Sequence, residues 1–217
     1  MWLRTLIGLS FFPMTLMNVS YAVIGSVVAP HVFWDRVYII AIIYVLGLGL
    51  SAHALDAVFS RKSKPWGNYL SNRVLLVIAI SSLIPAIAIG IYYAVTVVPL
   101  LWVFGLAEIF FLFAYNMEIG GGKFHTDAWF AFSWGSLPLL TGYVMQTNTL
   151  SLIPLILAIF AFLTSLIEIK ASRPYKNIRK GIQLEKYGQV DANYERILQS
   201  VVAAVTVLMT VLVAMKL

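Results

Sequence analysis

The chain has 217 residues, of which 61% are hydrophobic and 11% are charged, and its formal net charge at pH 7 is +6. No soluble domain could hide this much apolar surface, whereas a lipid bilayer requires it. The composition therefore excludes a soluble globular protein and predicts a polytopic membrane protein. The chain has no cysteine, which excludes disulfides and thiolate metal sites.

Apolar runs of about 20 residues, the length that crosses about 30 Å of hydrocarbon, recur along the whole chain. We expect a single all-α transmembrane bundle over residues 1–217, with about seven spans near residues 5–29, 37–58, 74–95, 99–117, 128–146, 150–169 and 197–216. The first run could instead be a secretory signal. It is longer than the apolar core of a signal, however, and contains Pro13 and Asn18, which suit a packed bundle helix.

The apolar segment from Val74 to Tyr115 contains one charged residue, Glu108, and could form one span or two. A single helix of that size would be about 63 Å long, twice the hydrocarbon thickness, so we expect two. Of the 15 Lys and Arg residues, all but Arg36 and Lys216 then lie on the N-terminal side of the membrane. The positive-inside rule places the N-terminus in the cytoplasm and the C-terminus outside. The net charge thus reflects topology and does not indicate nucleic-acid binding.

Two groups of polar residues fall on the predicted cytoplasmic side. His53 and Asp56 end the second span, and residues three apart lie on one face of a helix. The second group occupies the connection between the fourth and fifth spans: Asn116, Glu118, Lys123, His125 and Asp127, with the glycines Gly120 to Gly122. Consecutive glycines allow a tight turn or the binding of an anion by backbone amides. Because the hairpin between the groups returns the chain to the same surface, both groups could converge on one cavity.

These side chains form a mixed nitrogen and oxygen ligand set for one or two divalent ions. The expected metal ligands are Asp56, His53, Glu118, His125 and Asp127. Nearby cations would attract a phosphate or diphosphate headgroup: Arg61, Lys62, Lys64 and Lys123. The alternative interpretation is that the acidic and imidazole groups hydrogen-bond across helices, the cations only set the topology and the glycines only form a turn.

The stretch HALDAVFSRKSKPW resembles the first Asp-rich motif of UbiA-type membrane prenyltransferases, in which N-D-x-x-D-x-x-x-D precedes a K-P-W or R-P-like element. With Lys64–Trp66 set on that element, Asp56 matches the middle Asp of the motif without a gap. His53 then stands at the first Asp and Ser60 at the last. The stretch YNMEIGGGKFHTD takes the place of the second polar motif of that family. The chain therefore resembles a diverged and shortened member.

The resemblance implies a transferase that acts on an isoprenoid or other lipid diphosphate in a cavity that faces the cytoplasm. It implies Mg²⁺ as the cofactor, although His53 and His125 would also suit Mn²⁺ or Zn²⁺. The expected catalytic residues are Asp56, His53, Glu118 and Asp127. The expected substrate-binding residues are Arg61, Lys64, Lys123, Asn116, Glu108 and Trp134. The expected partners are a prenyl diphosphate or another lipid substrate and the lipid bilayer, which we expect to be the cytoplasmic membrane, with no nucleic acid.

Glu108 lies near the middle of the fourth span, where a bare carboxylate is most costly. We expect it to be protonated or paired, and either to line the cavity or to relay a proton. The alternative is an interhelical hydrogen bond to one of four polar residues: Asn18, Ser81, Ser82 or Ser133. Trp134 could line a pocket or pack in the core.

Two other function classes stay open. A transporter or ion-translocating protein would use Glu108, with helices interrupted by Pro13, Pro85 and Pro138, as a site near the midplane. A membrane subunit without chemistry of its own would use the polar groups to bind a partner. The basic connection 170–196 is expected on the cytoplasmic surface, with a short amphipathic helix near anionic lipid.

Overall fold

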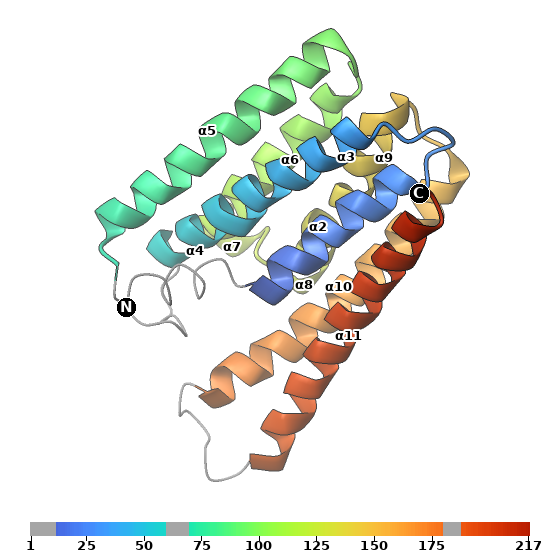
Figure 1. Ribbon diagram of the computed structural model, residues 1–217. Helices are drawn as coiled ribbons and strands as arrows, with labels where there is room; N and C mark the ends of the chain where they lie inside the picture. The colour runs from blue at the N-terminus through green and yellow to red at the C-terminus, as the bar shows by residue number, and fades with distance from the viewer. Residues whose placement is uncertain (1–11, 60–69, 180–187) are drawn as a thin grey trace.

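The computed structural model describes residues 12–59, 70–179 and 188–217 of the chain. All regular elements in these ranges are helices, which confirms the all-α expectation, and most of them run side by side as a bundle (Figure 1). In chain order the elements are α2 (Phe12–Val27), α3 (Trp34–Tyr44), η1 (Val45–Ala52), α4 (His53–Phe59), α5 (Asn72–Thr96), α6 (Leu101–Asn116), α7 (Ile119–Gly122), α8 (Asp127–Ala131), η2 (Phe132–Ser136), α9 (Leu137–Thr147), α10 (Leu152–Arg179) and α11 (Gly188–Ala214). The π-helical segments η1 and η2 continue their neighbours, so α3–η1–α4 and α8–η2–α9 each form one longer helical body.

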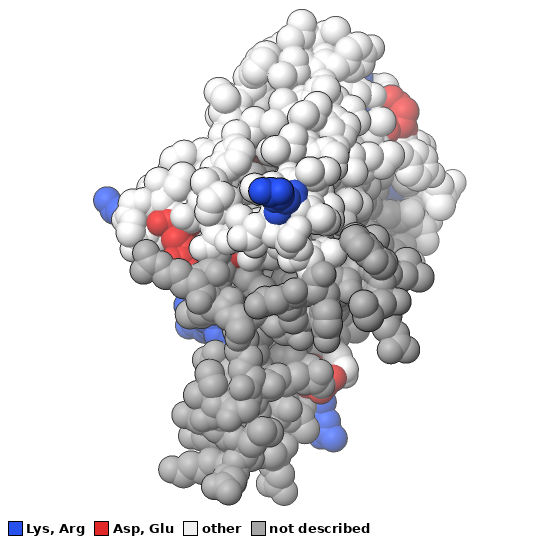
Figure 2. All heavy atoms as spheres, turned by 90° about the vertical axis from the view of Figure 1, so that its left-hand side faces the viewer, with Lys and Arg blue, Asp and Glu red and all other residues white. Residues whose placement is uncertain are grey.

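Four helices of the described chain are long and apolar enough to cross a membrane: Trp34–Phe59, Asn72–Thr96, Leu152–Pro174 and Asn193–Ala214. They support an integral membrane protein, and the space-filling view shows few charged side chains on the described part of the face that it presents (Figure 2). The other expected spans correspond to α2, to α6 and to α8–η2–α9. Whether these shorter bodies cross the membrane, and how the termini are oriented, stay predictions.

The break expected in the long apolar segment is present, since α5 ends at Thr96 and α6 begins at Leu101. The structure corrects the expectation for the basic region. Helix α10 continues past the expected end of the sixth span to Arg179, and α11 begins at Gly188. The described parts of the basic connection, residues 170–179 and 188–196, therefore belong to two long helices. In Figure 1 these ends of α10 and α11 project beyond the rest of the bundle.

Most of α2 is buried, and it packs mainly against α9 and α11. The contact with α9 depends on small residues. A Cβ added to Gly25 would overlap with Leu139 O, and a Cβ added to Gly142 would overlap with Ala22 O. Ser26 Oγ donates a hydrogen bond to Gly142 O at 3.1 Å. Small residues and one hydroxyl thus let the two backbones touch, as they do in many membrane bundles.

Two cations bind backbone carbonyls at the end of the bundle where α2 and α9 end, here called the Lys216 end. Lys216 Nζ donates to Ala29 O at 3.0 Å, just beyond α2. Arg36 Nη1 donates to Met145 O at 3.2 Å, in the last turn of α9. Carbonyls at a helix C-terminus lack partners within the helix and carry partial negative charge, so cations are favourable there. Arg36 and Lys216, the two cations that the predicted topology places on the C-terminal side of the membrane, therefore have a structural role.

Candidate functional site

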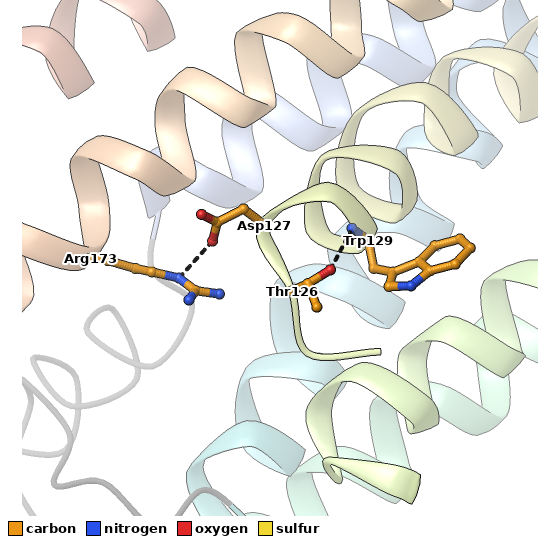
Figure 3. Close-up of polar contacts among 4 residues, drawn as sticks. All are labelled: Thr126, Asp127, Trp129 and Arg173. Atoms are coloured by element: carbon orange, nitrogen blue, oxygen red, sulfur yellow. Dashed lines mark hydrogen bonds and ion pairs between the residues drawn. The ribbon is translucent and has the colours of Figure 1, made fainter. Parts of the chain in front are cut away.

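At the opposite end of the bundle, an ion pair joins α8 to α10. Asp127 Oδ1 lies 2.9 Å from Arg173 Nε (Figure 3). The Asp127 side chain is 32% exposed and that of Arg173 is 44% exposed, although the paired oxygen Oδ1 is itself buried. Thr126 caps α8, because its hydroxyl accepts a hydrogen bond from Trp129 N at 3.3 Å. The cap holds Asp127 in the first turn, where a carboxylate suits the helix dipole. We call this region the Asp127 end.

Tyr115 connects the two polar groups identified in the sequence. Its side chain is buried, and the charges of Arg173, Asp56 and Asp127 all influence its hydroxyl group. The four residues come from four elements: Asp56 from α4, Tyr115 from α6, Asp127 from α8 and Arg173 from α10. Charges from segments far apart in the sequence therefore act on one buried tyrosine.

The His125 ring lies against Tyr115. The two rings are stacked with 4.4 Å between their centroids and an interplanar angle of 23°. His125 Nδ1 is 3.0 Å from Tyr115 O. Because a carbonyl can only accept a hydrogen bond, Nδ1 carries the proton, and Nε2 is the acceptor nitrogen in the neutral ring.

His53 and Trp134 lie at the two π-helical segments. His53 directly follows η1 and Trp134 belongs to η2; their ring centroids are 5.3 Å apart, and both side chains are buried. A π-turn disturbs the regular ladder of helix hydrogen bonds, and Trp134 O accepts a hydrogen bond from Asn18 Nδ2 at 3.0 Å. Trp134 also stacks on Phe130, with 5.4 Å between centroids. Trp134 is therefore part of the main apolar core, and His53 is buried beside it.

The glycine-rich connection turns tightly between α6 and α8. Glu118 has a φ of 50°, and Gly120 to Gly122 have φ values from 68° to 82°, a left-handed conformation that favours glycine. Two amides are used within the turn, since Gly122 N donates to Glu118 O and His125 N donates to Gly122 O. Lys123 is exposed, and the Asn116 amide donates to a carbonyl one turn back in its own helix. These residues lie near the Asp127 end, but none of their side chains joins the Asp127–Arg173 pair.

Within the described ranges, no three His, Asp or Glu side chains lie close enough together to hold a metal ion by themselves. Asp56 and Asp127 do both act on Tyr115. Mg²⁺ usually binds one or two carboxylates and completes its shell with water and substrate phosphates, so a magnesium site at Asp56 and Asp127 stays an expectation. Arg61 and Lys64, two of the expected substrate-binding cations, lie outside the described residues.

Glu108 lies about two helical turns from Tyr115 along α6 and lines a separate pocket of about 310 Å³. Tyr44 donates a hydrogen bond from its hydroxyl to Glu108 Oε1 at 2.6 Å. The interhelical partners considered from the sequence were wrong. All four candidates bind backbone carbonyls instead, three of them in their own helix: Asn18, Ser81, Ser82 and Ser133.

Sequence reasoning missed two contacts of the candidate site residues, that of Arg173 with Asp127 and that of Tyr44 with Glu108. Arg173 was counted only as one of the cations that set the topology. It lies at the end of an apolar run on the same predicted side as Asp127, and this position could have indicated the ion pair. Comparisons with protein-family models, curated proteins and solved structures find no match for the chain. The resemblance to UbiA-type prenyltransferases stays an expectation from the motif residues.

Proposed function

We propose that the protein is an integral membrane transferase, similar to UbiA-type prenyltransferases, that acts on an isoprenoid or other lipid diphosphate at the Asp127 end. The observation that carries the proposal is the partly exposed Asp127–Arg173 ion pair, and Asp56 supports it because its charge acts on the same tyrosine, Tyr115. Acidic and basic groups side by side suit a headgroup that binds together with a divalent cation. The charge count supports a cytoplasmic location for this end.

Arg173 is the residue best placed to bind phosphate. Its Nε is paired with Asp127, and the terminal nitrogens of a guanidinium can donate further hydrogen bonds to phosphate oxygens. Asp127 orients the guanidinium group. Since the Arg173 side chain is 44% exposed, a headgroup can reach it.

His125 supplies a group that can move a proton. Tyr115 O holds Nδ1 as the protonated nitrogen, and the stacked Tyr115 ring fixes the plane of the imidazole. Nε2 could then take the proton that an acceptor substrate releases when the new bond forms. With Asp56 and Asp127 as its protein ligands, a bound Mg²⁺ would neutralise charge on the diphosphate leaving group.

The test is transfer by the purified protein, supplied with a labelled prenyl diphosphate and Mg²⁺, Mn²⁺ or Zn²⁺. We expect Arg173→Gln to weaken diphosphate binding at least about tenfold, because a hydrogen bond to a charged group is worth about 1.5–3 kcal/mol. We expect Asp56→Asn and Asp127→Asn to abolish metal-dependent turnover. Arg73→Gln is the matched control, since Arg73 is an exposed cation in the first turn of α5.

Two outcomes would contradict the proposal. Equal losses in Arg173→Gln and Arg73→Gln would mean that the overall positive charge, and not this site, attracts the diphosphate. A folded wild-type protein that neither binds a divalent ion nor turns over any prenyl diphosphate would exclude the transferase.

A further inference from the structure

The pocket that contains Glu108 lies between the α3–η1 body, α5 and α6 and is here called the Glu108 pocket. Its lining is almost entirely apolar. Three of its lining residues, Ile91, Trp102 and Leu106, are 44%, 42% and 61% exposed on the outer surface of α5 and α6. In an integral membrane protein such a surface faces lipid. The pocket therefore opens toward the bilayer.

Glycines keep the Glu108 pocket open. Gly47 of η1, Gly90 of α5 and Gly105 of α6 all line it, and a Cβ added to any of them would meet no atom within 4 Å. Helix packing does not require glycine at these positions, in contrast to Gly25 and Gly142, where a Cβ would overlap with a neighbouring backbone. Glycine inside a helix is less favourable than alanine. Three glycines that leave space in one pocket therefore point to an occupant.

Glu108 gives the pocket a polar anchor. Its Oε1 accepts the hydrogen bond from Tyr44, and within the described chain no group hydrogen-bonds to its Oε2. A polar oxygen in an apolar membrane pocket is costly unless it finds a hydrogen-bond partner. A ligand that brings such a partner into the pocket would be favoured over one that is purely hydrocarbon.

We propose that the Glu108 pocket binds a lipid-soluble molecule with an apolar body and one hydroxyl group, which enters from the bilayer and places its hydroxyl on Glu108 Oε2. A hydroxyl both donates and accepts hydrogen bonds, so it satisfies Oε2 whether the carboxyl group is ionised or neutral. The site is independent of the transferase proposal, because the Glu108 pocket shares no lining residue with the Asp56, Tyr115, Asp127 and Arg173 group.

The same lining disfavours a bare ion as the occupant. Besides Glu108, the polar side chains that line the pocket are Tyr44 and Thr141. Both hydroxyls are engaged, since Tyr44 donates to Glu108 and Thr141 donates to Leu137 O at 2.8 Å. A hard cation needs about six oxygen ligands. The pocket cannot supply them, whereas an alcohol needs only one partner.

The experiment compares two photoreactive probes, a decanol and the matching decane, with the full-length protein in lipid nanodiscs. We expect saturable crosslinking of the decanol probe to peptides of η1, α5 and α6, and about tenfold weaker crosslinking of the decane probe, the difference that one hydrogen bond can make. Glu108→Leu should weaken decanol labelling about tenfold, whereas Glu108→Gln should restore most of it. Gly90→Leu and Gly105→Leu should each remove saturable labelling by filling the pocket.

Val103→Leu is the control for the filling variants, because Val103 is an exposed residue of α6 that does not line the pocket. Thermal unfolding of each variant shows that it is folded. Equal labelling by both probes, unchanged labelling in the folded Glu108→Leu protein, or labelling that persists in Gly90→Leu would overturn the proposal. Asp127→Asn should leave decanol labelling unchanged, so failure of the transferase and failure of this pocket are distinguishable.

Discussion

At the level of single residues, the Asp127–Arg173 pair is placed for binding more than for stability. Both side chains are partly exposed, and ion pairs of that kind contribute only about 0.2–1 kcal/mol to folding. The pair does, however, hold a guanidinium group where its charge acts on Tyr115. Its expected role is therefore to orient Arg173 toward an anionic headgroup.

Asp127→Asn should separate binding from stability. We expect the free energy of unfolding to fall by about 1 kcal/mol or less, because both side chains of the ion pair are partly exposed, while diphosphate binding falls about tenfold or more. Denaturant unfolding in detergent and equilibrium binding of the diphosphate measure the two effects. Thr126→Ala is the control, since it removes the cap of α8 at a cost of about 1 kcal/mol without removing a charge. A larger loss of stability in Asp127→Asn than in Thr126→Ala, with binding unchanged, would make the pair structural.

At the level of the helices, glycine has two opposite uses in this protein. Gly142 lets α9 touch α2, where any side chain would overlap with Ala22 O. Gly90 of α5 faces open space in the Glu108 pocket. The first kind serves packing and the second leaves a volume unfilled, although both occur inside apolar helices of similar composition.

Alanine substitutions at Gly142 and Gly90 should therefore have effects of opposite sign. We expect Gly142→Ala to lower the free energy of unfolding by about 1–3 kcal/mol, because the added methyl forces α2 and α9 apart. We expect Gly90→Ala to raise it by about 0.5–1 kcal/mol, since the helix gains a better helix former without a clash. Denaturant unfolding of the two purified variants measures both. A destabilised Gly90→Ala protein would mean that this position is packed in the membrane.

At the level of the whole molecule, the two ends of the bundle use charge differently. At the Lys216 end, Arg36 binds a carbonyl in the last turn of α9, and Lys216 binds a carbonyl just beyond the end of α2. At the Asp127 end, Arg173 binds a carboxylate and stays accessible. This difference agrees with a topology in which most Lys and Arg residues lie on one side of the membrane, and the two on the other side hydrogen-bond to backbone carbonyls.

The absence of cysteine from the chain allows a direct test of that topology. Lys123→Cys lies in the turn at the Asp127 end, and Thr149→Cys lies between α9 and α10; both positions are exposed. We expect a membrane-impermeant thiol reagent to label Thr149→Cys in intact cells, and to label Lys123→Cys only after the cells are opened. Labelling of both variants from the same side would contradict the passage of α8–η2–α9 across the membrane.

The parts of the fold that were predictable from sequence depend on local properties of the chain. The all-α class and the break between Thr96 and Leu101 follow from the length and composition of apolar runs, which any bilayer would impose. The placement of His53 and Asp56 near the end of a helical body follows from the same pattern. The extension of α10 to Arg179 was missed because polar residues that continue a helix beyond the membrane look, in sequence, like a surface connection.

The sequence by itself thus determined a helical membrane protein with two polar groups at helix ends, because hydrophobicity and helix length depend on residues that are neighbours in the sequence. Only the tertiary structure decided which side chains meet: Arg173 with Asp127, and Tyr44 with Glu108. Each of these contacts joins elements distant in sequence. Which face of a helix turns toward which neighbour is set by packing of whole helices, here through close approaches such as that of Gly142 to Ala22.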